Sequence, residues 1–120
     1  MPFKLACLGG FFAAVLLVTA LHAGERSETR LVRKTGVDSL YPATFAVANC
    51  PHLAIDGVRF KKAEAAYRLR PGDLGPGGEF ADDINTLAAG LKDSLEDDRN
   101  AFCSSAALQF AVIAGVLDRR

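Results

Sequence analysis

Residues 77–98 read GGEFADDINTLAAGLKDSLEDD, and this stretch decides the class of fold that the sequence predicts. Its large apolar residues recur at intervals of three or four positions: Phe80, Ile84, Leu87, Leu91 and Leu95. This spacing places all five on one stripe of an α-helix. Glu79, Asp82 and Asp83 fall in the first turn, where carboxylates interact favourably with the positive end of the helix dipole. We therefore predict a helix over 79–96.

A second helix is expected directly after the acidic run at 96–98. Carboxylates at the C-terminal end of a helix oppose its dipole, so a break in this run is favoured over one continuous helix. Either Asp97 or Asp98 then serves as the N-cap of a helix over 99–114. Gly115 is a natural C-terminal stop for it. A single bent helix is the alternative.

Two further helices are predicted upstream. The residues over 56–70 place apolar side chains on one stripe and basic ones outside it, with Asp56 as the N-cap. This helix has to end before Pro71. A shorter helix is expected to begin near Pro42, because proline is favoured at the first helical position, and to end before Pro51. The predicted fold class is all-α, a small bundle of three to four helices.

The glycine- and proline-rich segment RPGDLGPGG, residues 70–78, is interpreted as a connection between helices. Glycine-rich loops that hold phosphate carry a lysine and a serine or threonine at fixed places, and this segment has neither. Its two prolines also lack the backbone N–H groups that such a cradle would use. No cofactor site is therefore expected here.

The N-terminal region predicts export from the cytosol. Lys4 precedes an unbroken run over 5–21 of apolar residues, glycine and threonine, and small residues follow it. This order is typical of a signal peptide, here assigned to 1–23. The run is also at the short edge for a membrane span, so a retained anchor is the alternative. The expected location is the periplasm or the extracellular space.

The rest of the chain divides by composition. Residues 24–38 hold seven charged side chains and few aliphatic ones, and we expect a flexible leader because so little apolar surface does not offset the entropy of ordering. The helical domain is assigned to 39–117 and a short tail to 118–120.

Cysteine usage predicts one structural disulfide. Removal of the signal peptide leaves Cys50 and Cys103, and an even number of cysteines in an oxidising compartment is normally paired. Closing a loop of this length stabilises a small domain by about 4 kcal/mol. The adjacent His52 leaves two alternatives open, a metal site and a reactive thiol. One histidine with two cysteines lacks a fourth ligand for tetrahedral zinc, and a disulfide-bonded sulfur is not a nucleophile.

The charges are distributed unevenly although the formal net charge is zero. Residues 24–72 carry nine basic and five acidic side chains, whereas residues 73–98 carry one basic and eight acidic ones. We interpret this as the basic helix over 56–70 facing the acidic helix over 79–96. An acidic face for a cationic partner is the alternative. Basic and aromatic residues do not interleave, so no nucleic-acid surface is expected. No residue pattern predicts an enzyme.

The layout resembles the small periplasmic acid-stress chaperones of Gram-negative bacteria. The matching features are the opening MPFKLACLGGFFAAVLLVTALHA, the separation of 53 positions between Cys50 and Cys103, and the helical periodicity between them. The glycine–proline loop and the basic leader depart from that pattern. The resemblance implies a homodimer that opens at low pH and shields unfolded client proteins, and it assigns no client-binding residue.

The functional expectation is thus an exported, non-catalytic binding or chaperone-like protein whose partner is another protein. The alternative is a membrane-tethered structural or accessory protein, held by an uncleaved N-terminal segment. Contact with a membrane is expected only in that alternative.

Overall fold

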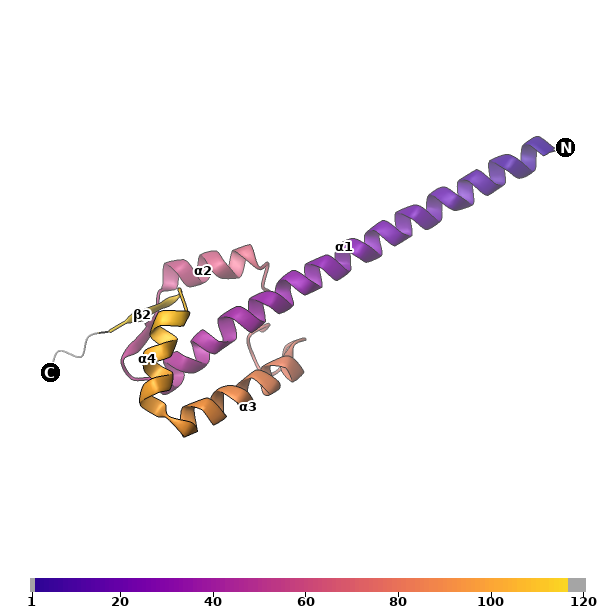
Figure 1. The fold of residues 1–120 in the computed structure, drawn as a ribbon. Coiled ribbons are helices and arrows are strands. Elements are labelled where there is room, and N and C mark those ends of the chain that lie inside the picture. Colours follow the sequence, from indigo (N-terminus) through magenta and orange to yellow (C-terminus); the bar gives the residue numbers. More distant parts are fainter. Residues whose placement is uncertain (1, 117–120) are drawn as a thin grey trace. The chain divides into compact units, whose positions relative to one another are not determined.

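A computed structural model describes the backbone of residues 2–116 and the side chains of residues 26–116. The described chain forms four helices and two short strands (Figure 1). In chain order they are α1 (Pro2–Asn49), β1 (Leu53–Ile55), α2 (Gly57–Ala66), α3 (Ala81–Asp97), α4 (Arg99–Gln109) and β2 (Ile113–Gly115). The predicted helical, disulfide-linked fold is confirmed. The expected signal peptide at 1–23 lies outside the residues whose side chains are described.

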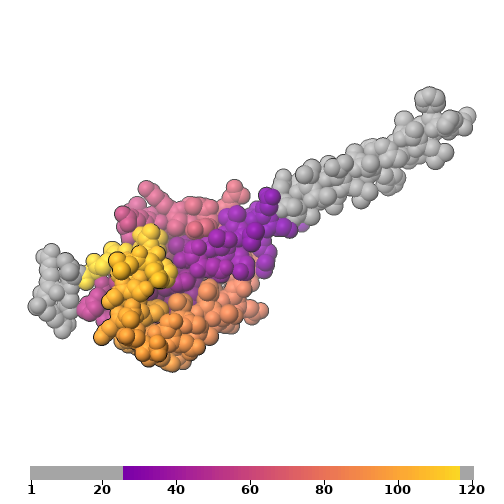
Figure 2. Space-filling view, in the orientation of Figure 1, coloured from indigo at the N-terminus to yellow at the C-terminus, as the bar shows by residue number. Residues whose placement is uncertain are grey.

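The chain divides into two compact units, Met1–Leu31 and Val32–Arg120. The core, the disulfide and the buried ion pair described below all belong to the second unit. Within that unit the last part of α1 runs between the other helices, with α2 and α3 on opposite sides of it (Figures 1 and 2).

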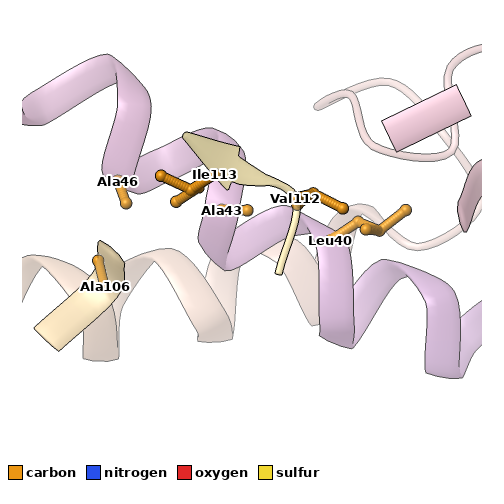
Figure 3. Packing of buried hydrophobic residues seen from close by; sticks show 6 residues of the cluster. All are labelled: Leu40, Ala43, Ala46, Ala106, Val112 and Ile113. Atoms are coloured by element: carbon orange, nitrogen blue, oxygen red, sulfur yellow. The ribbon is translucent and has the colours of Figure 1, made fainter. Parts of the chain in front are cut away.

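The core forms along one stripe of α1. Val37, Leu40, Ala43 and Ala46 recur every three positions and are buried. Ala106 of α4, together with Val112 and Ile113 at the start of β2, packs against the last three of these residues (Figure 3). Three of the contacting side chains are alanines, so the backbones approach closely and a small domain still achieves a closed core.

The prediction of a flexible leader at 24–38 is wrong, because this segment is part of helix α1. Arg33 and Val37 are both buried, one turn apart on the same stripe as Leu40. Composition suggested disorder because the segment holds seven charged side chains and few aliphatic ones. Helical spacing nevertheless brings the few residues that pack onto one face, and tertiary contacts order the segment.

The prediction that a helix starts near Pro42 is also wrong, because α1 continues through this residue. Proline inside a helix removes one backbone hydrogen bond and costs about 3 kcal/mol in an exposed helix. Here Pro42 is buried and directly precedes the core residue Ala43.

A close approach between α1 and the end of α2 depends on a glycine. A Cβ atom placed on Gly36 would overlap the side chain of Tyr67, and it would also lie 3.1 Å from Leu69. Glycine in a helix costs roughly 1 kcal/mol relative to alanine. The absence of a side chain at Gly36 is what allows Tyr67 to lie against α1.

Local signals placed the starts of α2 and α4 correctly. Asp56 accepts a hydrogen bond from the Arg59 backbone N–H at 3.2 Å, and Asp98 accepts one from Ala101 at 3.0 Å. Asp98 therefore separates two helices, and the single bent helix is excluded. Helix α2 ends at Ala66, earlier than predicted, where the chain turns through a left-handed residue, Arg68 (φ 54°).

The helix expected to run to 114 is wrong at its C-terminal end. Helix α4 stops at Gln109, and β2 pairs antiparallel with β1, Ile113 opposite Ile55 and Gly115 opposite Leu53. Gly115 is thus a strand residue rather than a helix stop. The β-branched pair Val112 and Ile113 favours extended backbone once a partner strand is available.

The predicted pairing between the basic and the acidic helix is also wrong. Among the described residues, no ion pair joins α2 to α3, and the two helices lie on either side of α1 (Figure 1). The charge that does pair across the fold belongs to α1 and to the loop before α3.

Candidate functional site

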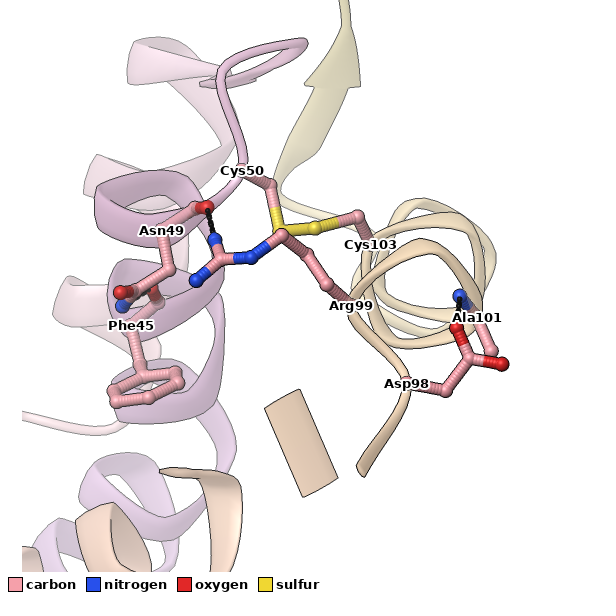
Figure 4. The surroundings of a disulfide bond; sticks show 7 residues. All are labelled: Phe45, Asn49, Cys50, Asp98, Arg99, Ala101 and Cys103. Carbon is pink, nitrogen blue, oxygen red and sulfur yellow. Dashed lines mark hydrogen bonds between the residues drawn. A yellow bond between two sulfur atoms is a disulfide. The ribbon is translucent and has the colours of Figure 1, made fainter. Parts of the chain in front are cut away.

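The disulfide joins the end of α1 to the middle of α4. The Cys50 and Cys103 Sγ atoms lie 2.06 Å apart and their Cα atoms 5.7 Å apart, which confirms the predicted cross-link (Figure 4). Cys50 is only 1% exposed. The cross-link adds about 4 kcal/mol of stability in the chain-entropy model, which is comparable to the whole stability of a small domain.

Two non-covalent contacts support the same junction. Phe45 of α1 and Phe102 of α4 pack edge to face with their ring centroids 5.9 Å apart. Arg99 donates a hydrogen bond from Nη1 to the backbone carbonyl of Asn49 at 2.9 Å (Figure 4). Since the end of α1 leaves its last carbonyls without helical partners, a cation there is favourable. A covalent bond, an aromatic contact and a hydrogen bond therefore join the end of α1 to α4.

The reactive-thiol and metal alternatives find no support at Cys50 and His52. Both sulfurs are bonded, so neither cysteine presents a thiolate. His52 is exposed and lines a small apolar pocket of about 280 Å³ with Leu53, Cys103 and Val116. Within residues 26–116 no three His, Cys, Asp or Glu side chains are grouped so that they could hold a metal ion.

A buried ion pair links the glycine–proline loop to α1. This pair was not predicted from the sequence. Arg33 and Asp73 are 5% and 4% exposed and form two parallel hydrogen bonds, Nη2 to Oδ1 at 2.8 Å and Nε to Oδ2 at 3.1 Å. Asp73 also accepts from the Arg70 backbone N–H at 2.8 Å. Arg33 makes two further contacts. Its Nη1 atom lies 3.0 Å from the carboxylate of Glu79, and its guanidinium lies 5.2 Å from the centroid of the Phe80 ring.

This arrangement shifts the pKa of both partners in the direction that keeps them charged. The hydrogen bond from Arg33 is the largest cause that lowers the pKa of Asp73, followed among the lowering causes by the Arg70 N–H, and together they outweigh desolvation. The hydrogen bond to Asp73 likewise raises the pKa of Arg33. The pair positions the loop over α1.

An open groove of about 400 Å³ lies between α3 and α4. These two helices share one face of the second unit, in orange and yellow-orange in Figure 2. Its lining mixes apolar side chains, carboxylates and neutral polar groups. The apolar residues Leu91, Phe102, Ala106 and Phe110 are called the floor below, and the carboxylates Asp97 and Asp98 at the helix junction are called the rim; Ser94, Ala101, Ser105 and Gln109 complete the lining. Helical periodicity placed Leu91 on the apolar stripe of the predicted helix over 79–96, and only the tertiary arrangement shows that this residue also lines a groove.

Some large apolar side chains also remain on the surface. Leu108 of α4 is 89% exposed, and Val58 and Val116 are more than half exposed. Scattered exposed apolar residues are normal in soluble domains and require no ligand. The groove is distinct from them because apolar and charged groups meet there.

Comparison with protein-family models, curated proteins and solved structures found no match for this chain. A membrane-spanning helix was sought in the part of the chain with described side chains, and none there is long and apolar enough.

Proposed function

We propose that the protein is exported and acts outside the cytosol as a small, non-catalytic binding protein that holds other polypeptides in a chaperone-like manner. The disulfide supports export, because such bonds persist in oxidising compartments and are rare in the cytosol. The apolar run over 5–21 at the N-terminus supports the same conclusion.

The single observation that carries the binding role is the groove between α3 and α4. Its floor presents Leu91, Phe102 and Phe110 to a side chain from another molecule, and its open shape admits a polypeptide segment. The described titratable groups favour binding over catalysis. His52 is exposed, and the buried pair Arg33 and Asp73 is fully engaged in structural hydrogen bonds.

Export is tested by fractionating cells that express the full chain and measuring the intact mass of the purified protein. We expect a mature N-terminus between Leu21 and Gly24 and a disulfide that forms in the exported fraction. A cytosolic protein with both thiols free would contradict the proposal.

The chaperone-like role is tested by following the aggregation of a denatured model protein by light scattering between neutral and acidic pH. We expect aggregation to be suppressed at substoichiometric to equimolar protein, together with binding of a hydrophobic dye at low pH. Absence of both effects across the pH range would remove the chaperone-like role.

A second candidate is a membrane-tethered accessory protein, favoured by the 17 residues over 5–21 that approach the length of a span. This candidate requires that Met1 be retained and that alkaline carbonate fail to extract the protein from membranes. The mass measurement above therefore distinguishes the two candidates.

A further inference from the structure

The floor of the α3–α4 groove is held in place before any ligand arrives. Phe102 is fixed against Phe45 by the edge-to-face contact at 5.9 Å, and the next residue, Cys103, is covalently bonded to α1. Ala106, one turn further along α4, is 2% exposed and belongs to the core. A preformed floor does not have to be ordered on binding, which lowers the entropic cost of association.

The rim of this groove carries negative charge that the described residues do not neutralise. Asp97 and Asp98 are both exposed. The carboxylate of Asp98 caps the Ala101 N–H through Oδ1, while the neighbouring Arg99 extends away toward Asn49 (Figure 4). In residues 26–116 no Lys, Arg or His nitrogen lies within 4.0 Å of either carboxylate.

The nearest basic residue on α3 is also engaged elsewhere. Lys92 lies 3.9 Å from Glu96, one turn along the same helix. The groove therefore combines the apolar floor residues with rim carboxylates that form no ion pair within residues 26–116. An occupant that matches both features carries an apolar side chain next to a cationic one.

From this complementarity we propose that the groove binds a segment of another polypeptide in which leucine-like or aromatic side chains neighbour lysine or arginine. The apolar side chain occupies the floor at Phe102 and Phe110, and the cation pairs with Asp97 and Asp98. This inference rests on the proposed binding function and names its ligand class. It also gives a role to the acidic junction between α3 and α4, where only one carboxylate oxygen is used for capping.

The test uses a short fluorescent peptide of leucine and lysine, with leucine–glutamate and serine–lysine peptides as matched probes. Fluorescence anisotropy with the full mature protein is expected to show binding of the leucine–lysine peptide alone. Because the charge contacts are exposed, added salt weakens the binding. Equal binding of the leucine–glutamate or the serine–lysine peptide would overturn the proposal.

Two charge variants separate the rim from the general acidity of α3. The D97N/D98N protein retains an N-cap, since asparagine caps as well as aspartate, and its affinity is expected to fall by about tenfold at low salt. The D82N/D83N protein removes the same charge at the other end of α3, outside the groove, and is expected to bind like the wild type. Equal loss in both variants would overturn a specific rim.

Two steric variants locate the binding to the groove. Ser105 lines the groove, whereas the adjacent Ser104 lines the pocket beside the disulfide. Ser105→Trp is expected to abolish peptide binding, and Ser104→Trp is expected to leave it unchanged. Intact disulfide and unchanged circular dichroism confirm folding, and Asp97→Asn alone provides a milder variant if the tryptophan disturbs the fold.

The same proteins separate this inference from the proposed function. If the wild type suppresses aggregation but Ser105→Trp does so equally, the groove proposal fails and the binding function stands. If the wild type neither binds peptide nor suppresses aggregation, both fail. Concentration-dependent dimerisation that Ser105→Trp abolishes, without peptide binding, would identify a second copy as the occupant and would overturn the proposed ligand.

Discussion

Within the second unit, two links join remote parts of the chain to the last part of α1 and the residue that follows it, and the two links differ in their chemistry. At Cys50 the link to Cys103 is covalent and indifferent to acid, although a reductant breaks it. At Arg33 the link to Asp73 is ionic, indifferent to reductant, and dependent on a charged carboxylate. Both links bring distant parts of the chain to one helix. The comparison shows that a small domain can rely on separate chemistries at two places along the same part of the chain.

The largest effect on stability is expected from removing the disulfide between Cys50 and Cys103. C50A/C103A is expected to lower the free energy of unfolding by about 4 kcal/mol, because the unfolded chain regains the freedom of the open loop. Urea denaturation of the variant and of the reduced wild type should give matching losses. An unchanged urea midpoint in both would show that packing at Phe45 and Phe102 suffices without the bond.

Breaking the ion pair between Arg33 and Asp73 should lower the free energy of unfolding somewhat less. Arg33→Met leaves the buried Asp73 carboxylate without its partner and is expected to cost about 3 kcal/mol. The matched control is Lys34→Met, whose half-exposed pair with Asp38 at 3.1 Å contributes less than about 1 kcal/mol. Urea denaturation of both variants measures the difference. Similar losses would mean that the Arg33 pair behaves as a surface pair.

A smaller effect on stability is expected from changing the packing of α1 near the ion pair between Arg33 and Asp73. Gly36→Ala drives a methyl group into Tyr67 and is expected to destabilise the protein by about 2 kcal/mol. Gly90→Ala in α3 meets no atom within 4 Å and is expected to stabilise it by up to about 1 kcal/mol through helix propensity. Thermal melts of the two variants should shift in opposite directions.

The smallest effect on stability is expected from acid, which acts on the ion pair between Arg33 and Asp73 and leaves the disulfide intact. The folded-state pKa of Asp73 is lowered below its unfolded value of about 3.9, so the unfolded chain takes up the proton first as the pH falls. The contribution of the pair is therefore complete above about pH 4 and is lost as the pH falls through the folded-state pKa.

Urea midpoints measured from pH 6 to pH 2 test this expectation in the wild type and in Asp73→Asn. The variant is less stable at neutral pH and is expected to show a shallower loss in acid. An equally steep acid loss in both proteins would assign the titration to other carboxylates. The disulfide variant should keep the wild-type pH dependence.

Sequence reasoning succeeded where a signal was local. The apolar spacing over 80–95 is a local property of the chain. Ile84 and Leu95 of α3 and its N-cap Phe80 are buried, and Leu87 and Leu91 are partly buried. The caps at Asp56 and Asp98 depend on backbone groups three residues away. The pairing of Cys50 with Cys103 followed from there being only two cysteines after the expected signal peptide.

Reasoning from the sequence failed where a residue's state depends on a distant partner. Arg33 lies in a charged segment, and nothing in its neighbourhood predicts burial. Its partner Asp73 lies 40 positions away in a loop whose composition indicates only turns. The same holds for Ile113, whose strand conformation depends on pairing with Ile55.

The candidate groove was accessible to the sequence only in part. The acidic junction at 96–98 was visible, and an acidic face for a cationic partner was one of the interpretations considered. The apolar floor was not visible as a surface, because helical periodicity predicts burial without showing how deeply two helices close over it. The depth depends on the angle at which α3 and α4 meet at Asp98.

By itself, the sequence determined the helical class, the starts of α2 and α4, and the cross-link between Cys50 and Cys103, because each depends on residue spacing, on capping or on a count of cysteines. Only the tertiary structure decided that α1 continues through 24–38, that Arg33 is buried, and that the chain after Gln109 is extended. These outcomes depend on partners supplied by remote segments, and the free energy of such contacts exceeds local preference.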